Sequence, residues 1–300
     1  MKLIDLVEHE AARLDAAGVA FGHGTTNAFD EAAWLVLWRL GLPLDNLDAV
    51  ADRRLAAADM AAVKALVDQR IATRRPAAYL TGEAWLQGVP FFVDERVIVP
   101  RSLIAEVLAD GTLDAWLPPA GPARVLDLCT GNGSLAVLAA LAWPQAQILA
   151  TDLSADALAV AQRNVARHGL QQRITLAQGD GWAAVAPARG PFDLVLCNPP
   201  YVNAVSMAAL PPEFRAEPAL ALDGNRAGGA DGMDFVRPLL RDARRHLAAS
   251  GVLVLEIGHE RAHFEAGFPR LEVAWLPTSA GDEQVLLVEA GALRALEGAA

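Results

Sequence analysis

The chain has 300 residues, 53% of them hydrophobic, which suffices for one large domain or for a catalytic domain with a smaller companion. Its net charge of −11 at pH 7 argues against nucleic acid as a partner, because nucleic-acid binders usually carry a basic excess, and it favours a basic partner instead. No apolar run reaches the roughly 18 residues of a membrane helix. The two cysteines are too few for a disulfide framework or a metal knuckle.

The N-terminal residues and the histidines argue against two further classes. Residues 1–10 alternate charged and apolar side chains at helical spacing and lack the continuous apolar core of a secretory signal, so we expect a cytoplasmic protein. Only His259 and His263 are spaced to share one helix face as metal ligands, and we interpret this pairing as incidental. We therefore predict no metal site.

Apolar residues recur at helical spacing through residues 1–76. Asn27 is expected to cap the second helix and Gly41 to close it, while Asp59 is expected to open the third helix and Pro76 to mark its end. Residues 1–76 are therefore predicted to form a small helical domain, and we assign substrate recognition to it.

Two aromatic-rich runs, residues 84–86 and 91–93, flank the stretch Gln87-Gly88-Val89-Pro90. This arrangement predicts a β-hairpin with its loop at residues 87–90. We expect residues 77–101 to form this hairpin and to join the helical domain to the rest of the chain. Ser102 is then expected to cap the next helix.

Short apolar runs alternate with helical patterns through residues 102–300. Strands are expected at Arg124–Leu128, Ile148–Thr151, Ile174–Ala177, Phe192–Cys197 and Val252–Ile257, and helices up to Trp143, over Ser154–His168 and over Asp234–Leu247. This alternation predicts an α/β fold, Rossmann-like, with a mostly parallel sheet. The last two apolar runs, Leu271–Trp275 and Gln284–Val288, lack a long helix between them and would pair antiparallel at a sheet edge. Residues 202–231 have no clear period and many glycines and prolines, so we place substrate contacts there.

A glycine-bearing turn follows the first of these strands. Ligands bind beyond the carboxyl ends of strands in open α/β sheets, and glycines let the backbone approach a ligand closely. The spacing is not the Gly-x-Gly-x-x-Gly of dinucleotide sites, and Asp127 at the strand tip places a carboxylate where a cationic amino-acid group suits it. A cofactor site is therefore predicted, comprising Asp127, Thr130, Gly131 and Gly133. The alternative is an ordinary loop at the start of a helix.

Acidic residues also follow the second and third strands. Asp152, with Leu153, lies about twenty residues after the glycines, where a carboxylate can accept hydrogen bonds from both hydroxyls of a ribose. The alternative for Asp152 is an acid favoured by the dipole of the next helix. Asp180, Gly181 and Trp182 offer a carboxylate and an aromatic face to an adenine, although Trp182 packing in the core is the alternative.

The most informative stretch is Asn198-Pro199-Pro200-Tyr201, directly after the fourth strand. An amide nitrogen is a poor nucleophile because its lone pair is delocalised into the carbonyl, so a catalyst must hold it in line with the group that it attacks and accept its hydrogens. The side-chain oxygen of Asn198 and the carbonyl of Pro199 are suitable acceptors. The two prolines stiffen the loop, and Tyr201 offers a flat face to a planar amide or base. The alternative is a turn that proline merely stiffens.

With these residues the chain resembles the class I S-adenosylmethionine-dependent methyltransferases that carry an Asn-Pro-Pro-Tyr motif. Residues 79–85 and 93–102 are similar to the protein-glutamine N5-methyltransferases, which also have a helical N-terminal domain and a hairpin. Within that family Pro100-Arg101-Ser102 and residues 230–236 resemble the branch that acts on large-subunit ribosomal protein three rather than the release-factor branch. Leu103, where a second proline is usual, and Asn132, where a small or hydroxyl-bearing residue is usual, depart from the pattern.

The resemblance implies that S-adenosyl-L-methionine is the cofactor. It implies that Asp127, Gly131 and Asp152 contact this cofactor, with Asp180 and Trp182 near its adenine. It places Asn198 through Tyr201 on the glutamine amide, with Asn198 also bordering the cofactor. The implied reaction is a direct in-line methyl transfer to the amide nitrogen of a glutamine in a basic ribosomal protein.

Three alternatives stay open at this point. The same chemistry on peptide chain release factors would keep every assigned role. Methylation of the N6 amine of adenine in nucleic acid would use the same quartet on another planar nitrogen, although the acidic charge and the lack of a basic appended domain argue against it. The third alternative is not an enzyme but a ribosome-assembly factor that binds a nucleoside without turnover.

Overall fold

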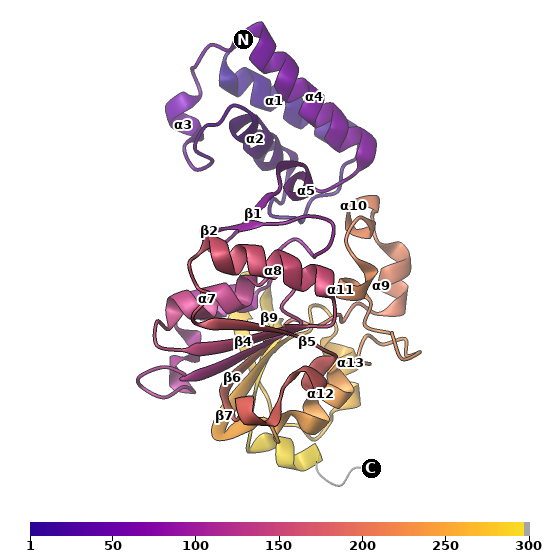
Figure 1. Ribbon diagram of the computed structural model, residues 1–300. Coiled ribbons are helices and arrows are strands. Elements are labelled where there is room, and N and C mark those ends of the chain that lie inside the picture. Colours follow the sequence, from indigo (N-terminus) through magenta and orange to yellow (C-terminus); the bar gives the residue numbers. More distant parts are fainter. Residues whose placement is uncertain (297–300) are drawn as a thin grey trace.

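A computed structural model of the protein describes residues 1–296. A group of helices formed by the N-terminal residues lies at one end of the molecule, a two-stranded hairpin follows it, and a seven-stranded sheet with helices on both faces makes up the remainder (Figure 1). None of the helices in this described range is long and apolar enough to cross a membrane.

The N-terminal region contains α1 (Leu3–Ala16), α2 (Ala28–Arg39), α3 (Leu47–Val50), α4 (Ala57–Thr73) and α5 (Ala77–Thr81). Their apolar faces share one buried cluster that includes Leu3, Leu35 and Val67. Asn27 caps α2 as predicted, because its side-chain oxygen accepts a hydrogen bond of 2.9 Å from the backbone N–H of Asp30. Helix α4 begins at Ala57 rather than at the predicted Asp59, since the two alanines before Asp59 continue the helix.

The hairpin consists of β1 (Glu83–Leu86) and β2 (Val89–Phe92), paired antiparallel. The predicted four-residue loop is wrong, because only Gln87 and Gly88 form the turn, with φ values of 49° and 71°. Pro90 is tolerated within β2 because both strands of a two-stranded sheet are edges. The side chain of Asn164 fixes the hairpin to the sheet domain, with hydrogen bonds of 2.7 and 2.9 Å to the backbone of Phe92.

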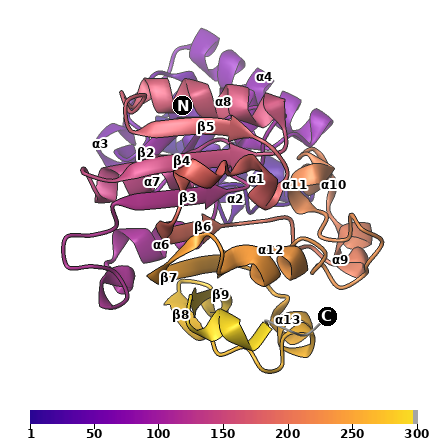
Figure 2. The same ribbon diagram turned by 60° about the horizontal axis from the view of Figure 1, so that its bottom comes forward.

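The sheet has the order β5-β4-β3-β6-β7-β9-β8, which Figure 2 shows from one edge to the other. Its strands are β3 (Arg124–Leu128), β4 (Gln147–Asp152), β5 (Ile174–Gln178), β6 (Phe192–Cys197), β7 (Leu247–Glu256), β8 (Ala274–Thr278) and β9 (Gly281–Glu289). The first five strands of that order run parallel, and β9 pairs antiparallel with both β7 and β8. The predicted α/β fold with a mostly parallel sheet and an antiparallel edge is confirmed.

Helices cover both faces of the sheet. One face packs against α6 (Ile104–Ala109), α7 (Ser134–Ala142) and part of α8 (Ala155–Arg167), and the other face packs against α12 (Val236–Ala243) and α13 (Arg261–Gly267). Helix α12 is shorter at both ends than the predicted helix over Asp234–Leu247. Leu247 instead begins β7, because it pairs with Phe192 of β6.

The segment expected to lack regular structure contains three short helices, α9 (Ala204–Ala209), α10 (Pro212–Arg215) and α11 (Ala219–Leu222). They are four to six residues long, too short to produce a visible period in the sequence. Short 3₁₀ turns complete the chain, at Thr112–Ala115, Gly181–Ala184, Pro187–Arg189 and Ala292–Leu296. Because β3, β4, β5 and β6 all end at the same edge of the sheet, the residues that follow them lie close together beside this segment.

Candidate active site

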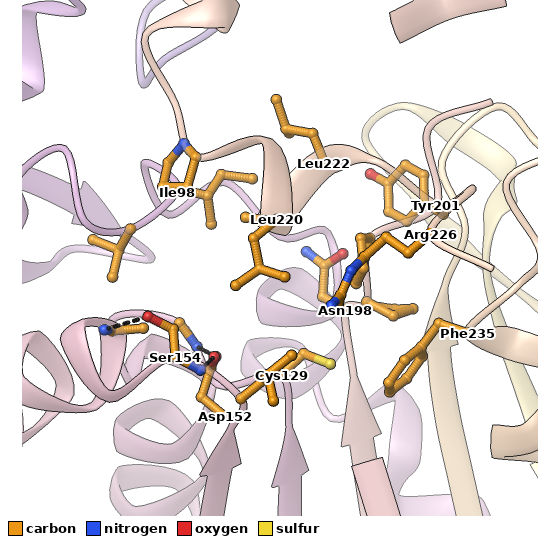
Figure 3. Close-up of a pocket in the computed structure, with 18 of the residues that line it drawn as sticks. Ile98, Cys129, Asp152, Ser154, Asn198, Tyr201, Leu220, Leu222, Arg226 and Phe235 are labelled. Atoms are coloured by element: carbon orange, nitrogen blue, oxygen red, sulfur yellow. Dashed lines mark hydrogen bonds between the residues drawn. The ribbon is translucent and has the colours of Figure 1, made fainter. Parts of the chain in front are cut away.

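A pocket of about 270 Å³ lies at the carboxyl ends of the parallel strands (Figure 3). Its inner part is lined by residues that end a strand or follow one within three residues, including Cys129, Gly131, Asp152 and Asp180. Its outer part is lined by residues of the hairpin-to-sheet connection and of α9 to α11, including Ile98, Leu210, Phe214, Leu220 and Leu222. The pocket therefore has a polar end on the sheet and an apolar end under the segment where substrate contacts were predicted.

The turn after β3 is shaped by three residues in the left-handed region, Cys129, Gly131 and Gly133, with φ values of 59°, 55° and 82°. Gly131 lines the pocket, whereas Gly133 lies against α8, where an added Cβ would be 3.2 Å from the Cβ of Ala161. Gly133 is thus required for the close packing of the turn on α8. Among the candidate glycines of this turn, the structure places only Gly131 on the pocket wall.

Asp127 is buried behind the turn and does not line the pocket. Its Oδ2 accepts hydrogen bonds of 2.5 Å from the Thr130 hydroxyl and 3.1 Å from the Ala136 N–H, so both Asp127 and Thr130 hold the turn in place. Its Oδ1 is buried without a hydrogen-bond partner. Burial raises the pKa of Asp127 to about 7, because the charged form is poorly solvated there.

Asp152 ends β4 and lines the pocket together with Leu153. Its two carboxylate oxygens accept hydrogen bonds of 2.9 Å from the backbone N–H groups of Gly131 and Ser154, which ties two strand ends together. Each oxygen keeps a further lone pair for a ligand. Burial raises the pKa of Asp152, and the backbone donors oppose this effect.

Asp180 and Gly181 line the pocket after β5, but Trp182 does not. The indole of Trp182 stacks on His246 with ring centroids 4.3 Å apart, and its N–H donates a 3.0 Å hydrogen bond to the carbonyl of Leu239. The packing alternative for this ring is therefore the one that the structure shows. The aromatic side chain at this end of the pocket is Phe235, whose ring lies 3.6 Å from the position of a Cβ on Gly181.

Asn198 directly follows β6, and Asn198, Pro199, Pro200 and Tyr201 all line the pocket. Figure 3 shows the amide of Asn198 between Leu220 on one side and Arg226 on the other. No hydrogen bond within residues 1–296 engages the Asn198 side chain, so its oxygen and nitrogen are available to a ligand. Both prolines are buried, which fixes the loop beneath this amide.

Tyr201 is held by groups from β7. Its hydroxyl donates a 3.3 Å hydrogen bond to Oε1 of Glu256, and burial raises its pKa. The ring lies over Gly258, where an added Cβ would be 2.5 Å from a ring carbon. Glu256 is itself buried, and its Oε2 accepts 2.6 and 2.9 Å hydrogen bonds from the Ser102 hydroxyl and the Leu103 N–H. Ser102 thus links the start of α6 to the tyrosine of the motif. Its predicted role as the cap of this helix is wrong, because Leu103 is the residue that precedes α6.

Arg101 of the Pro-Arg-Ser stretch lines the pocket and forms a two-pronged ion pair with Glu217, with both N–O distances 2.6 Å. Sequence reasoning missed Glu217, Phe235 and Glu256. Glu256 ends an apolar strand, as Asp152 does, and this position is the signal in the sequence that could have indicated it. Within the part of the chain that the structure describes, no group of three or more His, Cys, Asp or Glu side chains could hold a metal.

A family model and several curated relatives match this chain. Residues 112–217 match the model of the methyltransferase small domain. A ribosomal protein uL3 glutamine methyltransferase of Bordetella pertussis is 56% identical, over 95% of this chain and 94% of that protein. The proteins of the same name from Burkholderia pseudomallei and Bradyrhizobium diazoefficiens are 54% and 47% identical, over 98% and 97% of this chain and 96% and 91% of theirs.

Proposed function

The chain belongs to the ribosomal protein uL3 glutamine methyltransferase family, and from this premise we propose that it methylates a glutamine side-chain amide of uL3 with S-adenosylmethionine as the methyl donor. The observation that carries the proposal is the free amide of Asn198 on the wall between the polar and apolar ends of one pocket. A methyl donor in the polar end and a glutamine in the apolar end would meet there.

The polar end fits S-adenosylmethionine. Asp152 would hold the ribose hydroxyls, because each of its carboxylate oxygens keeps a lone pair after bonding the backbone. Asp180 and Gly181 would border the adenine, with Phe235 in place of Trp182 as the flat apolar neighbour. Gly131 would let the cofactor approach the backbone, and Leu153 would cover the nucleoside.

Asp127, Thr130 and Gly133 would act on the cofactor indirectly, by holding the turn that carries Gly131. The Oδ1 of Asp127 has no hydrogen-bond partner within the described residues, but it is buried behind the turn, so the proposal gives it no direct contact with the cofactor. When bound, S-adenosylmethionine supplies a methyl group activated by its sulfonium.

Where the two ends of the pocket meet, the Asn198 side-chain oxygen and the Pro199 carbonyl would accept the two hydrogens of the glutamine amide and aim its nitrogen at the methyl group. Pro200 and Tyr201 would keep these acceptors in place. Positioning of this kind supplies most of the rate gain when the nucleophile is neutral. After transfer, the nitrogen releases one proton to solvent, and the enzyme forms no covalent intermediate.

We further propose that the helical region, residues 1–76, recognises the substrate protein, that residues 77–101 connect it, and that residues 102–300 form the methyltransferase domain. The net charge of −11 favours a basic partner such as a ribosomal protein over nucleic acid. Because its proposed substrate is a ribosomal protein, we also propose that the enzyme acts in the cytoplasm.

Incubation with methyl-labelled S-adenosylmethionine tests the proposal. Purified uL3, a peptide chain release factor and an adenine-containing duplex serve as acceptors in separate reactions. The proposal predicts label in uL3 above the other two. Label confined to the release factor would support glutamine methylation but refute uL3 as the substrate. Label confined to the duplex would refute both parts of the proposal. Binding of S-adenosylmethionine with no labelled acceptor would favour a nucleoside-binding module.

A further inference from the structure

The apolar end of the pocket is supported from behind by His23, a residue of the N-terminal helical region between α1 and α2. His23 is 1% exposed and does not line the pocket. Its Nε2 lies 3.4 Å from Oε2 of Glu217, and its ring centroid lies 4.2 Å from that of Phe214, which does line the pocket. His23 therefore touches both a wall residue and the acid behind that wall.

Glu217 lies between His23 and Arg101 and contacts both. It accepts the two-pronged ion pair from Arg101 and a 2.9 Å hydrogen bond from the backbone N–H of Val99. Burial would raise the pKa of Glu217, but His23 and Arg101 outweigh burial and lower it to about 2. A charged, buried carboxylate therefore joins the N-terminal region to the stretch that carries Arg101.

Phe214 belongs to the short helix α10, and the N-terminal helical region makes a second contact with this helix. Glu213, in α10, lies 3.2 Å from Nη1 of Arg74 and 3.6 Å from Nη1 of the fully buried Arg70. Phe214 follows Glu213, and its ring packs on Gly22, where an added Cβ would be 3.0 Å from the ring. The N-terminal region thus contacts α10 at two successive residues, Glu213 and Phe214.

We propose that His23 is a positioning residue for the protein substrate, which holds Phe214 and, through Glu217, Arg101 in the wall that the glutamine-bearing segment contacts. This inference rests on the proposed function, because it takes the apolar end of the pocket as the substrate end. It gives the helical region a specific part in recognition: this region fixes one wall of the pocket without entering it. The polar end, with Asp152 and Asp180, is built from other elements and is independent of His23.

The test compares His23→Ala and His23→Gln with His9→Ala, an exposed histidine of the same helical region. For each variant the KM and kcat for the protein acceptor, the Kd for S-adenosylmethionine by calorimetry and the melting temperature are measured. We expect His23→Ala to raise KM roughly ten-fold, equivalent to about 1.4 kcal/mol, with the cofactor Kd unchanged. His23→Gln should recover most of this loss, because its side chain fills part of the same space and offers an N–H to Glu217. His9→Ala should match the wild type.

A folded His23→Ala enzyme with unchanged KM, or one in which KM and cofactor Kd rise together, would overturn the inference. If His23→Ala does not fold, His23→Leu decides, since it keeps an apolar side chain against Phe214 but offers no N–H to Glu217, and KM must again rise alone. The acceptor is whichever protein the wild-type enzyme labels. Absence of label in uL3 would therefore refute the proposed substrate, whereas the KM comparison on the labelled acceptor still judges the role of His23.

Discussion

The hydroxyl of Tyr201 donates to the buried carboxylate of Glu256, at 3.3 Å, and the second oxygen of that carboxylate holds Ser102 and the Leu103 N–H. The tyrosine of the motif and the start of α6 are therefore fixed by one acid at the end of β7. The hydroxyl of Tyr201 therefore already has a hydrogen-bond acceptor within the protein, and the ring is the part of Tyr201 that can contact a substrate.

Glu256→Ala is expected to lower kcat more than Tyr201→Phe does. The phenylalanine variant loses one hydrogen bond but keeps the ring over Gly258, so a loss of a few-fold is expected. The alanine variant leaves three donors unsatisfied in a buried setting, at about 1–3 kcal/mol each, and releases the ring. Steady-state kinetics and thermal denaturation of both variants check this order, and equal losses of kcat would contradict it.

Asn198→Ala is expected to lower kcat on the order of 100-fold, because the glutamine nitrogen loses an acceptor that aims it. The Kd for S-adenosylmethionine should change far less than kcat, since Asp152 and Asp180, rather than Asn198, are the residues assigned to its ribose and adenine. Single-turnover rates and calorimetry separate the two quantities. Equal loss of turnover and cofactor affinity would remove Asn198 from its assigned position on the amide.

Gly258→Ala and Gly169→Ala form a matched pair. Both glycines are left-handed, with φ values of 54° and 69°, so both substitutions carry the same backbone strain of roughly 1–2 kcal/mol. A methyl on Gly258 would also clash with the Tyr201 ring at 2.5 Å, whereas nothing lies within 4 Å of one on Gly169. We expect activity to fall sharply only in Gly258→Ala. Similar activities of the two variants at equal stability would show that the ring position does not matter.

Asp127→Asn tests the buried carboxyl through the pH dependence of stability. The folded state binds a proton on Asp127 up to a pKa of about 7, whereas the ordinary value is 3.8. Between these values the unfolded state binds fewer protons, so the free energy of unfolding decreases as pH rises, by up to about 1.4 kcal/mol per pH unit. The asparagine variant should show a shallower decrease between pH 4 and pH 7 in urea denaturation. The slope will not vanish, because burial also raises the pKa of Asp152 and Glu256. An unchanged slope would mean that Asp127 is ionised throughout.

The strands of the sheet, their ends and the residues that directly follow them could be predicted from the sequence, because they depend on the pattern of apolar and polar residues nearby in the chain. Gly131, Asp152, Asp180 and Asn198 come together in one pocket because parallel strands end at one edge. What could not be predicted depends on contacts between distant segments. Phe235 occupies the place expected for Trp182 because the indole finds a partner in α12, and nothing local to either residue reveals this.

The helical region shows the same limit. Its helices follow from their apolar period, but the contact of His23 with Glu217 joins residues that lie far apart in the sequence. As an isolated histidine in a glycine-rich stretch, His23 has no neighbouring ligand residue that would mark it. Only the packing of α10 against the segment between α1 and α2 brings it behind the pocket.

Fragment mass spectrometry of uL3 after reaction with the wild-type enzyme and with Asn198→Ala tests the central claim most directly. The account predicts one methyl group on the side-chain nitrogen of a glutamine in the wild-type reaction, and little or none with the variant under the same conditions. A methyl group on another residue type, or an unmodified uL3 beside a methylated release factor or adenine, would contradict it.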